Sequence, residues 1–305
     1  MNNYQHIIDS IYKEVSLLEN KGTVATYIPE LGKIDPEKLG VCLTTLNNTR
    51  YIAGNANERF SIQSIAKVLS LTLAYTFEGE ALWKRVDVEP SGTPFNSLIQ
   101  LEADNGIPRN PLINAGALVV CDVLVSHLKN PKHDFLAFVR RLANNDTIDY
   151  SKTIAASEKL NGFRNAALIN LIKTYNNIHN PIEEVLDFYF NMCAIEMSCV
   201  ELSNTFLYLA SDGINPVTNE TIVSESTSKR INAIMQLCGF YDEAGEFAFR
   251  VGLPGKSGVG GGIVAVLPDE YAITIWSPKL NQKGNSYLGM RFLELFTTAT
   301  ATSIF

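Results

Sequence analysis

The stretch SIAKVLSLTLAYTF, residues 64–77, decides how the rest of the chain is arranged. From Ile65 to Phe77, nine of thirteen residues are apolar, and they fall on every side of a helical wheel. A helix that is apolar all round is buried, and thirteen residues are too few to span a bilayer. We therefore expect a buried central helix around which the other elements pack.

Lys67 is the only charged residue of this stretch, and Ser64 precedes it by one helical turn. Burial penalises the ammonium form and lowers the pKa of a lysine, and a neutral amine is a usable general base near pH 7. Residues at this spacing share one helix face. Free backbone N–H groups at a helix start favour developing negative charge. A nucleophile, its base and part of an oxyanion site could therefore come from one turn.

The Ser-x-x-Lys pattern is weak by itself, because a serine can simply cap a helix and the lysine can extend to solvent. The pattern occurs four times, at Ser10/Lys13, Ser64/Lys67, Ser126/Lys129 and Ser226/Lys229. Only Lys67 is embedded in a hydrophobic helix, which favours the catalytic interpretation at this position.

Composition restricts the class of protein. With 305 residues, 46% hydrophobic and 19% charged, the chain can bury a sizeable core. The net charge of −7 argues against nucleic-acid binding. The first residues lack the layout of a signal peptide, and no apolar run is long enough for a transmembrane helix. We expect a cytoplasmic protein without membrane attachment.

Cysteines and histidines give no sign of a metal site. The five cysteines form no Cys-x-x-Cys motif and are interpreted as buried residues in a reducing compartment. The four histidines belong to no cluster with metal-ligand spacing, and the chain has no Gly-x-Ser-x-Gly elbow. Zinc chemistry and histidine-based serine catalysis are therefore disfavoured, and we expect no metal.

Strand signals lie at the two ends of the chain, and the middle is helical. Alternating apolar residues predict strands at 40–46, 50–54, 245–251, 263–267 and 271–276. Helical periodicity predicts helices at 4–20, 114–127, 134–145, 155–174, 181–193, 198–210, 228–239 and 286–300. Residues 80–115 are rich in turn signals and carry no regular periodicity.

These elements predict an α+β fold: an antiparallel sheet made by both chain ends and flanked by helices, with an all-helical insertion. We expect a single domain over residues 1–305. Its sheet subdomain would comprise about 1–63 and 242–305, and its helical subdomain about 64–241.

Lys256-Ser257-Gly258 precedes three consecutive glycines near the end of the chain. It could be a hairpin loop that needs positive φ angles, or a set of exposed backbone N–H groups facing an oxyanion. Together with Ser-x-x-Lys at a buried helix start, it matches the pattern of penicillin-recognising serine hydrolases.

Four separated motifs closely resemble the serine-dependent glutaminases: FSIQSIAK at 60–67, EPSGxxFN at 89–96, NGIPRNPLINAGA at 105–117 and GKSGVGGG at 255–262. The resemblance covers essentially the whole chain. It implies a β-lactamase/DD-peptidase-like fold and hydrolysis of L-glutamine to L-glutamate and ammonia. It also implies that no cofactor is needed and that the protein forms a homodimer or homotetramer.

The resemblance further implies roles for single residues. Ser64 would be the nucleophile and Lys67 its base, Tyr27 would approach the nucleophile, and Tyr241 would shuttle a proton. Backbone N–H groups of Ser64 and Val259 would form the oxyanion hole. Substrate contacts would come from Ser64, Asn114, Glu158, Asn165, Tyr189, Tyr241 and Val259. Lys256 would be a structural partner of the site.

These residue types suit a free amino acid, since Glu158 can pair with an ammonium and Asn and Tyr can donate to a carboxylate. Without the resemblance, Glu158 could be an exposed acid in a first helical turn, Asn165 a solvated residue and Tyr189 part of the core.

Two other functions stay open from the sequence. One is a different serine hydrolase of the same fold, acting on β-lactams, peptides or esters. The other is a non-catalytic amino-acid sensor that retains the pocket.

Overall fold

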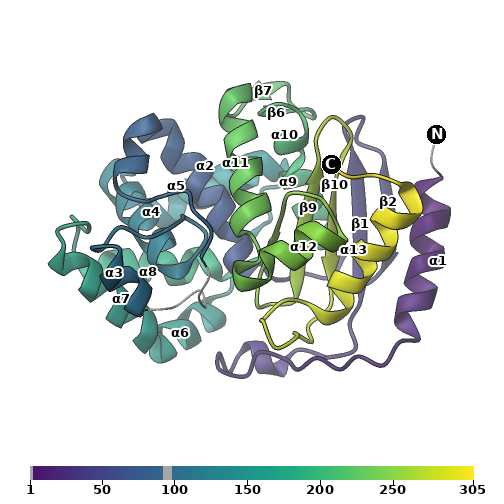
Figure 1. Ribbon diagram of the computed structural model, residues 1–305, viewed down its shortest axis with the longest axis horizontal. Coiled ribbons are helices and arrows are strands. Elements are labelled where there is room, and N and C mark those ends of the chain that lie inside the picture. The colour runs from purple at the N-terminus through teal and green to yellow at the C-terminus, as the bar shows by residue number, and fades with distance from the viewer. Residues whose placement is uncertain (1–2, 92–97) are drawn as a thin grey trace.

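The computed structural model describes residues 3–91 and 98–305 (Figure 1). One part contains a five-stranded antiparallel sheet in the order β2-β1-β10-β9-β8. Its strands are β1 (Gly40–Thr45), β2 (Arg50–Gly54), β8 (Gly255–Ser257), β9 (Gly262–Leu267) and β10 (Tyr271–Trp276). β1 pairs with β10, with Gly40 opposite Trp276 and Thr45 opposite Tyr271. The expected antiparallel sheet built by both chain ends is therefore confirmed.

The two faces of this sheet pack against different hydrophobic cores, because successive residues of a strand point to opposite faces. Val41 and Leu43 belong to one core, and Cys42 between them belongs to the other. The helices that share the first core are α1 (Tyr4–Ser16), α12 (Ala244–Arg250) and α13 (Tyr287–Thr300). On the second face, α9 (Cys199–Thr205) contacts β1 and β10.

The rest of the molecule, from α2 to α11, is the helical part, which lies on the left in Figure 1. Besides α9, its helices are α2 (Ala66–Glu78), α3 (Leu98–Ala103), α4 (Asn114–His127), α5 (Pro131–Ala143), α6 (Lys152–Asn161), α7 (Phe163–Thr174), α8 (Ile182–Cys193), α10 (Leu207–Ala210) and α11 (Glu225–Cys238). Together with the sheet part, these helices give the expected mixed helix-and-sheet architecture.

Helix α2 runs through the middle of the second core and contacts α4, α5, α8 and α11. Every residue from Ala66 to Ala74 is buried, whereas Phe77 near the end is 44% exposed. The buried central helix is thus confirmed over most of its length. Its first turn differs from the expectation, because Ser64 lies in a 3-10 turn, Gln63–Ile65, that leads into the α-helix.

The predicted strand at 245–251 is wrong, because these residues form α12. Phe247 and Phe249 would point to the same face of a strand, but Phe247 is buried and Phe249 is 91% exposed. The buried residues Ala244, Phe247 and Val251 have helical spacing and face one core. The third strand from the C-terminal end is instead β8, which contains Lys256.

Three further expectations need correction. The helix predicted at 155–174 is divided into α6 and α7 at Gly162, where a Cβ would lie 2.4 Å from the Phe190 ring. The helix predicted at 198–210 is divided at Phe206. Strands of two or three residues also accompany the helical part: β3 (Phe60–Ser61) precedes α2, and β4 (Asp149–Tyr150), β5 (Ile195–Met197), β6 (Ile214–Asn215) and β7 (Glu220–Thr221) lie within the helical middle. Strands this short are below the length at which alternation is recognisable.

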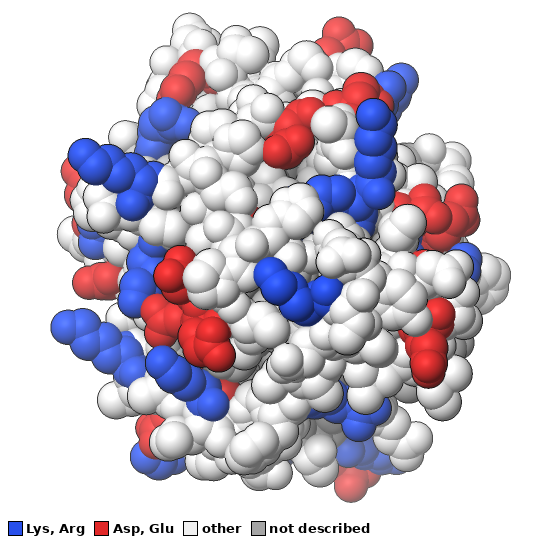
Figure 2. All heavy atoms as spheres, turned by 90° about the vertical axis from the view of Figure 1, so that its left-hand side faces the viewer, with Lys and Arg blue, Asp and Glu red and all other residues white. Residues whose placement is uncertain are grey.

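Residues 92–97 lie outside the described residues, so the motif at 89–96 and the turn-rich stretch 80–115 are described only in part. Among residues 3–91 and 98–305, no helix combines the length and apolar character needed to cross a membrane. Figure 2 views the molecule from the side of the helical part, where acidic and basic side chains are interspersed among uncharged residues. Charge of one sign does not dominate this face.

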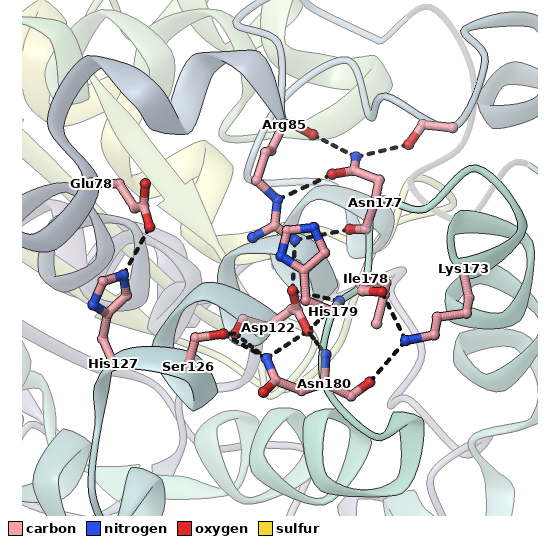
Figure 3. Close-up of polar contacts among 11 residues, drawn as sticks. Glu78, Arg85, Asp122, Ser126, His127, Lys173, Asn177, Ile178, His179 and Asn180 are labelled. Atoms are coloured by element: carbon pink, nitrogen blue, oxygen red, sulfur yellow. Dashed lines mark hydrogen bonds and ion pairs between the residues drawn. The ribbon is translucent and has the colours of Figure 1, made fainter.

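Helix α4 is anchored by the fully buried carboxylate of Asp122, two turns after its first residue, Asn114 (Figure 3). Arg85 Nη2 donates to Oδ2 at 2.6 Å, and the backbone N–H groups of His179 and Asn180 donate to Oδ1 at 3.0 and 2.8 Å. Burial raises the pKa of Asp122, but the hydrogen bonds from Arg85, Asn180 and His179 outweigh it and hold the pKa below its usual value. This cluster fixes the position of α4, which carries Asn114.

We expect Asp122→Ala to lower the free energy of unfolding at pH 7 by about 3–5 kcal/mol, because it leaves Arg85 beside a site without its carboxylate. The native pKa is depressed, so the stabilisation is present above the unfolded value of about 3.9 and is lost as the pH falls through the native value. Urea denaturation across pH measures both effects. The exposed pair between Glu246 and Arg250 supplies a control, since Glu246→Ala should cost less than about 1 kcal/mol. Equal losses for the two variants would contradict the assignment.

Candidate active site

A cavity of about 350 Å³ opens at the start of α2, where residues of the sheet part and the helical part meet. Eight of the nine expected site residues line it: Tyr27, Ser64, Asn114, Glu158, Asn165, Tyr189, Tyr241 and Val259. The ninth, Lys67, is fully buried and bonds to Asn114 in the cavity wall. The structure therefore brings residues that are up to 232 positions apart, Tyr27 and Val259, to one site.

Ser64 is buried at the cavity wall, close enough to the hydroxyl of Tyr241 to limit the rise in pKa that burial causes there. Both chain segments that meet here have an unusual backbone conformation. Gln63, which precedes Ser64, has φ of 50°, and Tyr241 itself has φ of 56°. Such values cost about 1–3 kcal/mol in a residue other than glycine and persist only where the surroundings hold them. Both chain segments that meet at the serine hydroxyl therefore contain a strained backbone conformation.

Lys67 donates its hydrogen bonds to Asn114 Oδ1 at 2.6 Å and to the Leu112 carbonyl at 3.3 Å. Asn114 in turn donates from Nδ2 to Asn165 Oδ1 at 2.9 Å. Burial lowers the pKa of Lys67 to about 8, although Cys193, Cys121 and Glu158 partly offset it. About a tenth of these amines are therefore neutral at pH 7, as a general base requires.

Tyr241 lies between the serine and two buried lysines. Its hydroxyl lies close to Ser64, while its ring centroid is 5.7 Å from Lys67 Nζ and 4.3 Å from Lys256 Nζ. Lys256 also donates to the carbonyls of Gly239 at 2.9 Å and Ser257 at 2.6 Å. Burial, and to a smaller extent repulsion by Lys67, lower the pKa of Lys256 well below its usual value. The Lys256 amine thus packs against the ring of Tyr241.

Glu158 is buried in the cavity wall and is not an exposed acid. Gln63 Nε2 donates to its Oε1 at 2.8 Å. Burial raises the pKa of Glu158 to about 7, and the bond from Gln63 and the charge of Lys67 limit the rise. A carboxylate held in this way can pair with a ligand cation, because that cation restores part of the lost solvation.

The glycine-rich turn after β8 lies against the segment that leads to Ser64. A Cβ at Gly258 would lie 2.4 Å from the Ile62 carbonyl oxygen, and a Cβ at Gly260 would lie 2.1 Å from that of Ser61. Only glycine permits this approach. Among the described residues, no backbone carbonyl accepts from the N–H groups of Ser64 or Val259. Both residues line the cavity, where these donors can serve an oxygen of a ligand.

The remaining expected residues differ in exposure. Tyr27 is 59% exposed at the cavity edge, Asn165 is half-buried, and Tyr189 is buried beside Phe190. Gln63, Arg164 and Cys193 also line the cavity, although the sequence did not single them out. Gln63 was detectable as the residue before Ser64 in the first motif. Cys193 was detectable from its spacing, four residues after Tyr189 on the same helix face.

The sheet of both chain ends, the helical part beside it and the Ser-x-x-Lys turn between them define an enzyme with the β-lactamase-like fold. Residues 22–305 match the family model described as Glutaminase. The chain belongs to the glutaminase family.

Similar proteins agree with this assignment over the full length. The chain is 57% identical over 302 residues to a glutaminase from Saccharophagus degradans, covering 99% of this chain and 98% of that one. The solved structure of the probable glutaminase ybaS matches with a TM-score of 0.94 and 32% identity, over 100% of this chain and 99% of that one. A probable glutaminase from Bacillus subtilis matches with a TM-score of 0.87 and 30% identity, over 99% and 96%.

We expect Gly260→Ala to lower kcat/KM about 100-fold, because the new methyl group would push the turn away from the segment before Ser64 and misalign the cavity wall. Kinetics with L-glutamine would measure the loss. Gly245→Ala is the matched control, since a Cβ at Gly245 meets nothing within 4 Å. Similar rates for both variants would show that the close approach has no role in the site.

Proposed function

We propose that this protein hydrolyses L-glutamine to L-glutamate and ammonia through an acyl-enzyme on Ser64. The observation that carries the proposal is that Ser64 and Tyr241 line one cavity with the buried Glu158, beside the buried amine of Lys67. The family of the chain supports the same reaction.

The substrate would bind with its α-ammonium at Glu158, the buried acid of the cavity. Its α-carboxylate would be met by neutral donors, for which Asn165 and Tyr189 are suited. The side-chain amide would then reach Ser64, with its oxygen between the N–H groups of Ser64 and Val259. In other acyl-transfer enzymes, one such donor contributes about 3–4 kcal/mol to the transition state.

In the first step, Ser64 Oγ attacks the amide carbon, and the hydroxyl proton passes to neutral Lys67, either directly or through Tyr241. The C–N bond breaks as a proton is returned to the nitrogen, which releases ammonia. In the second step, water attacks the γ-glutamyl ester and gives a proton to the same relay. L-Glutamate leaves and Ser64 regains its proton. Only residues of this chain and water take part.

We further propose a cytoplasmic homodimer or homotetramer. The five cysteines are buried and unpaired, which favours a reducing compartment. Large exposed apolar residues such as Phe163, Phe249 and Leu160 favour contacts with further copies. The proposed subdomains are residues 1–63 with 242–305, and residues 64–241. The positive φ angles of Gln63 and Tyr241 lie at both boundaries, which supports this division.

Ser64→Ala should lower ammonia release from L-glutamine by at least about 10⁴-fold, because no other group replaces the nucleophile. An ammonia assay with L-asparagine in parallel would measure this loss and the dependence on side-chain length. Ser70→Ala is the control, because Ser70 is a buried serine of α2 that, among the described residues, donates to the Lys67 carbonyl and does not line the cavity. Full activity of the Ser64 variant would remove this serine from the mechanism. Binding of glutamine by wild type without ammonia release would indicate a sensor.

The rate should rise with pH near neutrality. Ionisation of Glu158, with a pKa of about 7, should lower KM, and deprotonation of Lys67, with a pKa of about 8, should raise kcat. Profiles of kcat and KM against pH separate the two groups. Glu158→Gln should raise KM about 10-fold or more and remove its pH dependence, because a charged hydrogen bond is lost. Unchanged profiles in this variant would contradict the role of Glu158.

A further inference from the structure

Tyr241 has a strained backbone, so the residues around it must hold its conformation. It begins a 3-10 turn, Tyr241–Glu243, that connects α11 to α12. Its hydroxyl and ring face Ser64 and the two buried lysines. These contacts explain where the side chain points, but not what fixes the turn behind it.

The carboxylate of Glu243 attaches this turn to the loop between β10 and α13. Asn281 Nδ2 donates to Oε1 at 2.9 Å and to Oε2 at 3.0 Å, and Asn285 Nδ2 also donates to Oε2. The loop itself is well defined, because Asn281 Oδ1 accepts from the backbone N–H of Lys283 at 2.9 Å and of Asn285 at 3.1 Å. The turn is therefore bonded to a second, internally bonded segment.

Glu243 is unusual because its carboxylate is buried and has neutral partners. Within the described chain, no Lys, Arg or His lies at ion-pair distance from it, whereas its neighbour Asp242 pairs with Lys283 near the surface. A buried carboxylate without a cation costs stability. The three hydrogen bonds it accepts orient the turn, and this gives the residue a use that a hydrophobic side chain could not replace.

Glu243 acts from outside the substrate cavity. It lines a different cavity, of about 530 Å³, together with Asn281, and neither residue lines the cavity that contains Ser64. Direct contact between Glu243 and the substrate is therefore not the explanation for its arrangement.

We infer that Glu243 is a positioning residue: by bonding to Asn281 and Asn285 it holds the hydroxyl of Tyr241 against Ser64. The inference rests on the proposed role of Tyr241 in proton transfer. Without this attachment, Tyr241 would relax from its strained φ angle and its hydroxyl would move. A shift of about 1 Å in a reacting group can cost about 100-fold in rate.

Glu243→Gln is the central variant, because it keeps the shape but turns an –NH2 group toward the donors of Asn281 and Asn285. We expect kcat with L-glutamine to fall at least about 10-fold. The inhibition constant of L-glutamate, which depends mainly on the Glu158 end of the cavity, should change less than about 3-fold. Asp242→Asn is the matched control in the same turn and should keep kcat within about 2-fold.

A compensating variant separates positioning from general damage. Asn281→Asp alone places a second carboxylate beside Glu243 and should also lower kcat. In the double variant Glu243→Gln/Asn281→Asp, the introduced glutamine can donate to the introduced aspartate while accepting from Asn285. We expect kcat to return to within about 3-fold of wild type. Asn285→Ala removes one donor without changing charge and provides a milder test if Glu243→Gln alone does not fold; it should lower kcat about 3-fold or more.

Circular dichroism and thermal unfolding would identify variants that are folded at the assay temperature, and kcat is compared only among these. A folded Glu243→Gln or Asn285→Ala variant with wild-type kcat would overturn the inference, as would a folded double variant that does not recover. Tyr241→Phe distinguishes the proposed role of Tyr241 in proton transfer from the positioning role of Glu243. If Tyr241→Phe loses rate and Glu243→Gln does not, only the positioning role falls. If Tyr241→Phe keeps the wild-type rate, the proposed role of Tyr241 in proton transfer is wrong, and the positioning role of Glu243 is wrong with it.

Discussion

The removal of the Lys67 amine from water is the constraint on which the site depends. Helix α2 is buried along most of its length, so the amine has no access to bulk solvent and its pKa falls to about 8. Its hydrogen bonds then have to come from the protein, and Asn114 and Leu112 supply the acceptors. Asn114 is the first residue of α4, which the buried Asp122 anchors two turns further along the helix. Helix α2, the Arg85–Asp122 ion pair and the candidate base Lys67 are therefore connected through α4.

The helical part and the sheet contribute different components to the cavity. Ser64 and Lys67 come with α2 from the core of the helical part, whereas Val259 follows an edge strand of the sheet. Close approach of the two depends on Gly258 and Gly260, because side chains there would overlap the carbonyls of Ile62 and Ser61. A single added methyl group at Gly258 or Gly260 would therefore move the Val259 N–H group away from Ser64.

The sequence predicted the elements whose signal is local and strong. The stretch 64–77, which is apolar on every side of the helix, and the runs 263–267 and 271–276 needed no tertiary information. Residues 245–251 were misassigned because Phe247 and Phe249 alternate with other residues over a segment shorter than two helical turns. The helical spacing of the buried residues Ala244 and Val251 is visible only in the folded chain. Ser64 and Lys67 were singled out from the buried helix itself, whereas the other expected site residues were found through the resemblance to the family. The contact of Tyr241 with Ser64 and the attachment of Glu243 to Asn281 and Asn285 join segments that are far apart in the sequence, so no local pattern reveals them.

The close approach of the glycine-rich turn to Ser64 has a consequence for the chain as it is synthesised. Ser64, the proposed nucleophile, leaves the ribosome almost two hundred residues before Val259 and the strands that position it. Until β10 pairs with β1, β9 with β10 and β8 with β9, Ser64 has neither the Val259 N–H group nor a cavity beside it. A nascent or truncated chain would therefore carry an inert serine, and hydrolytic activity would report completion of the whole fold.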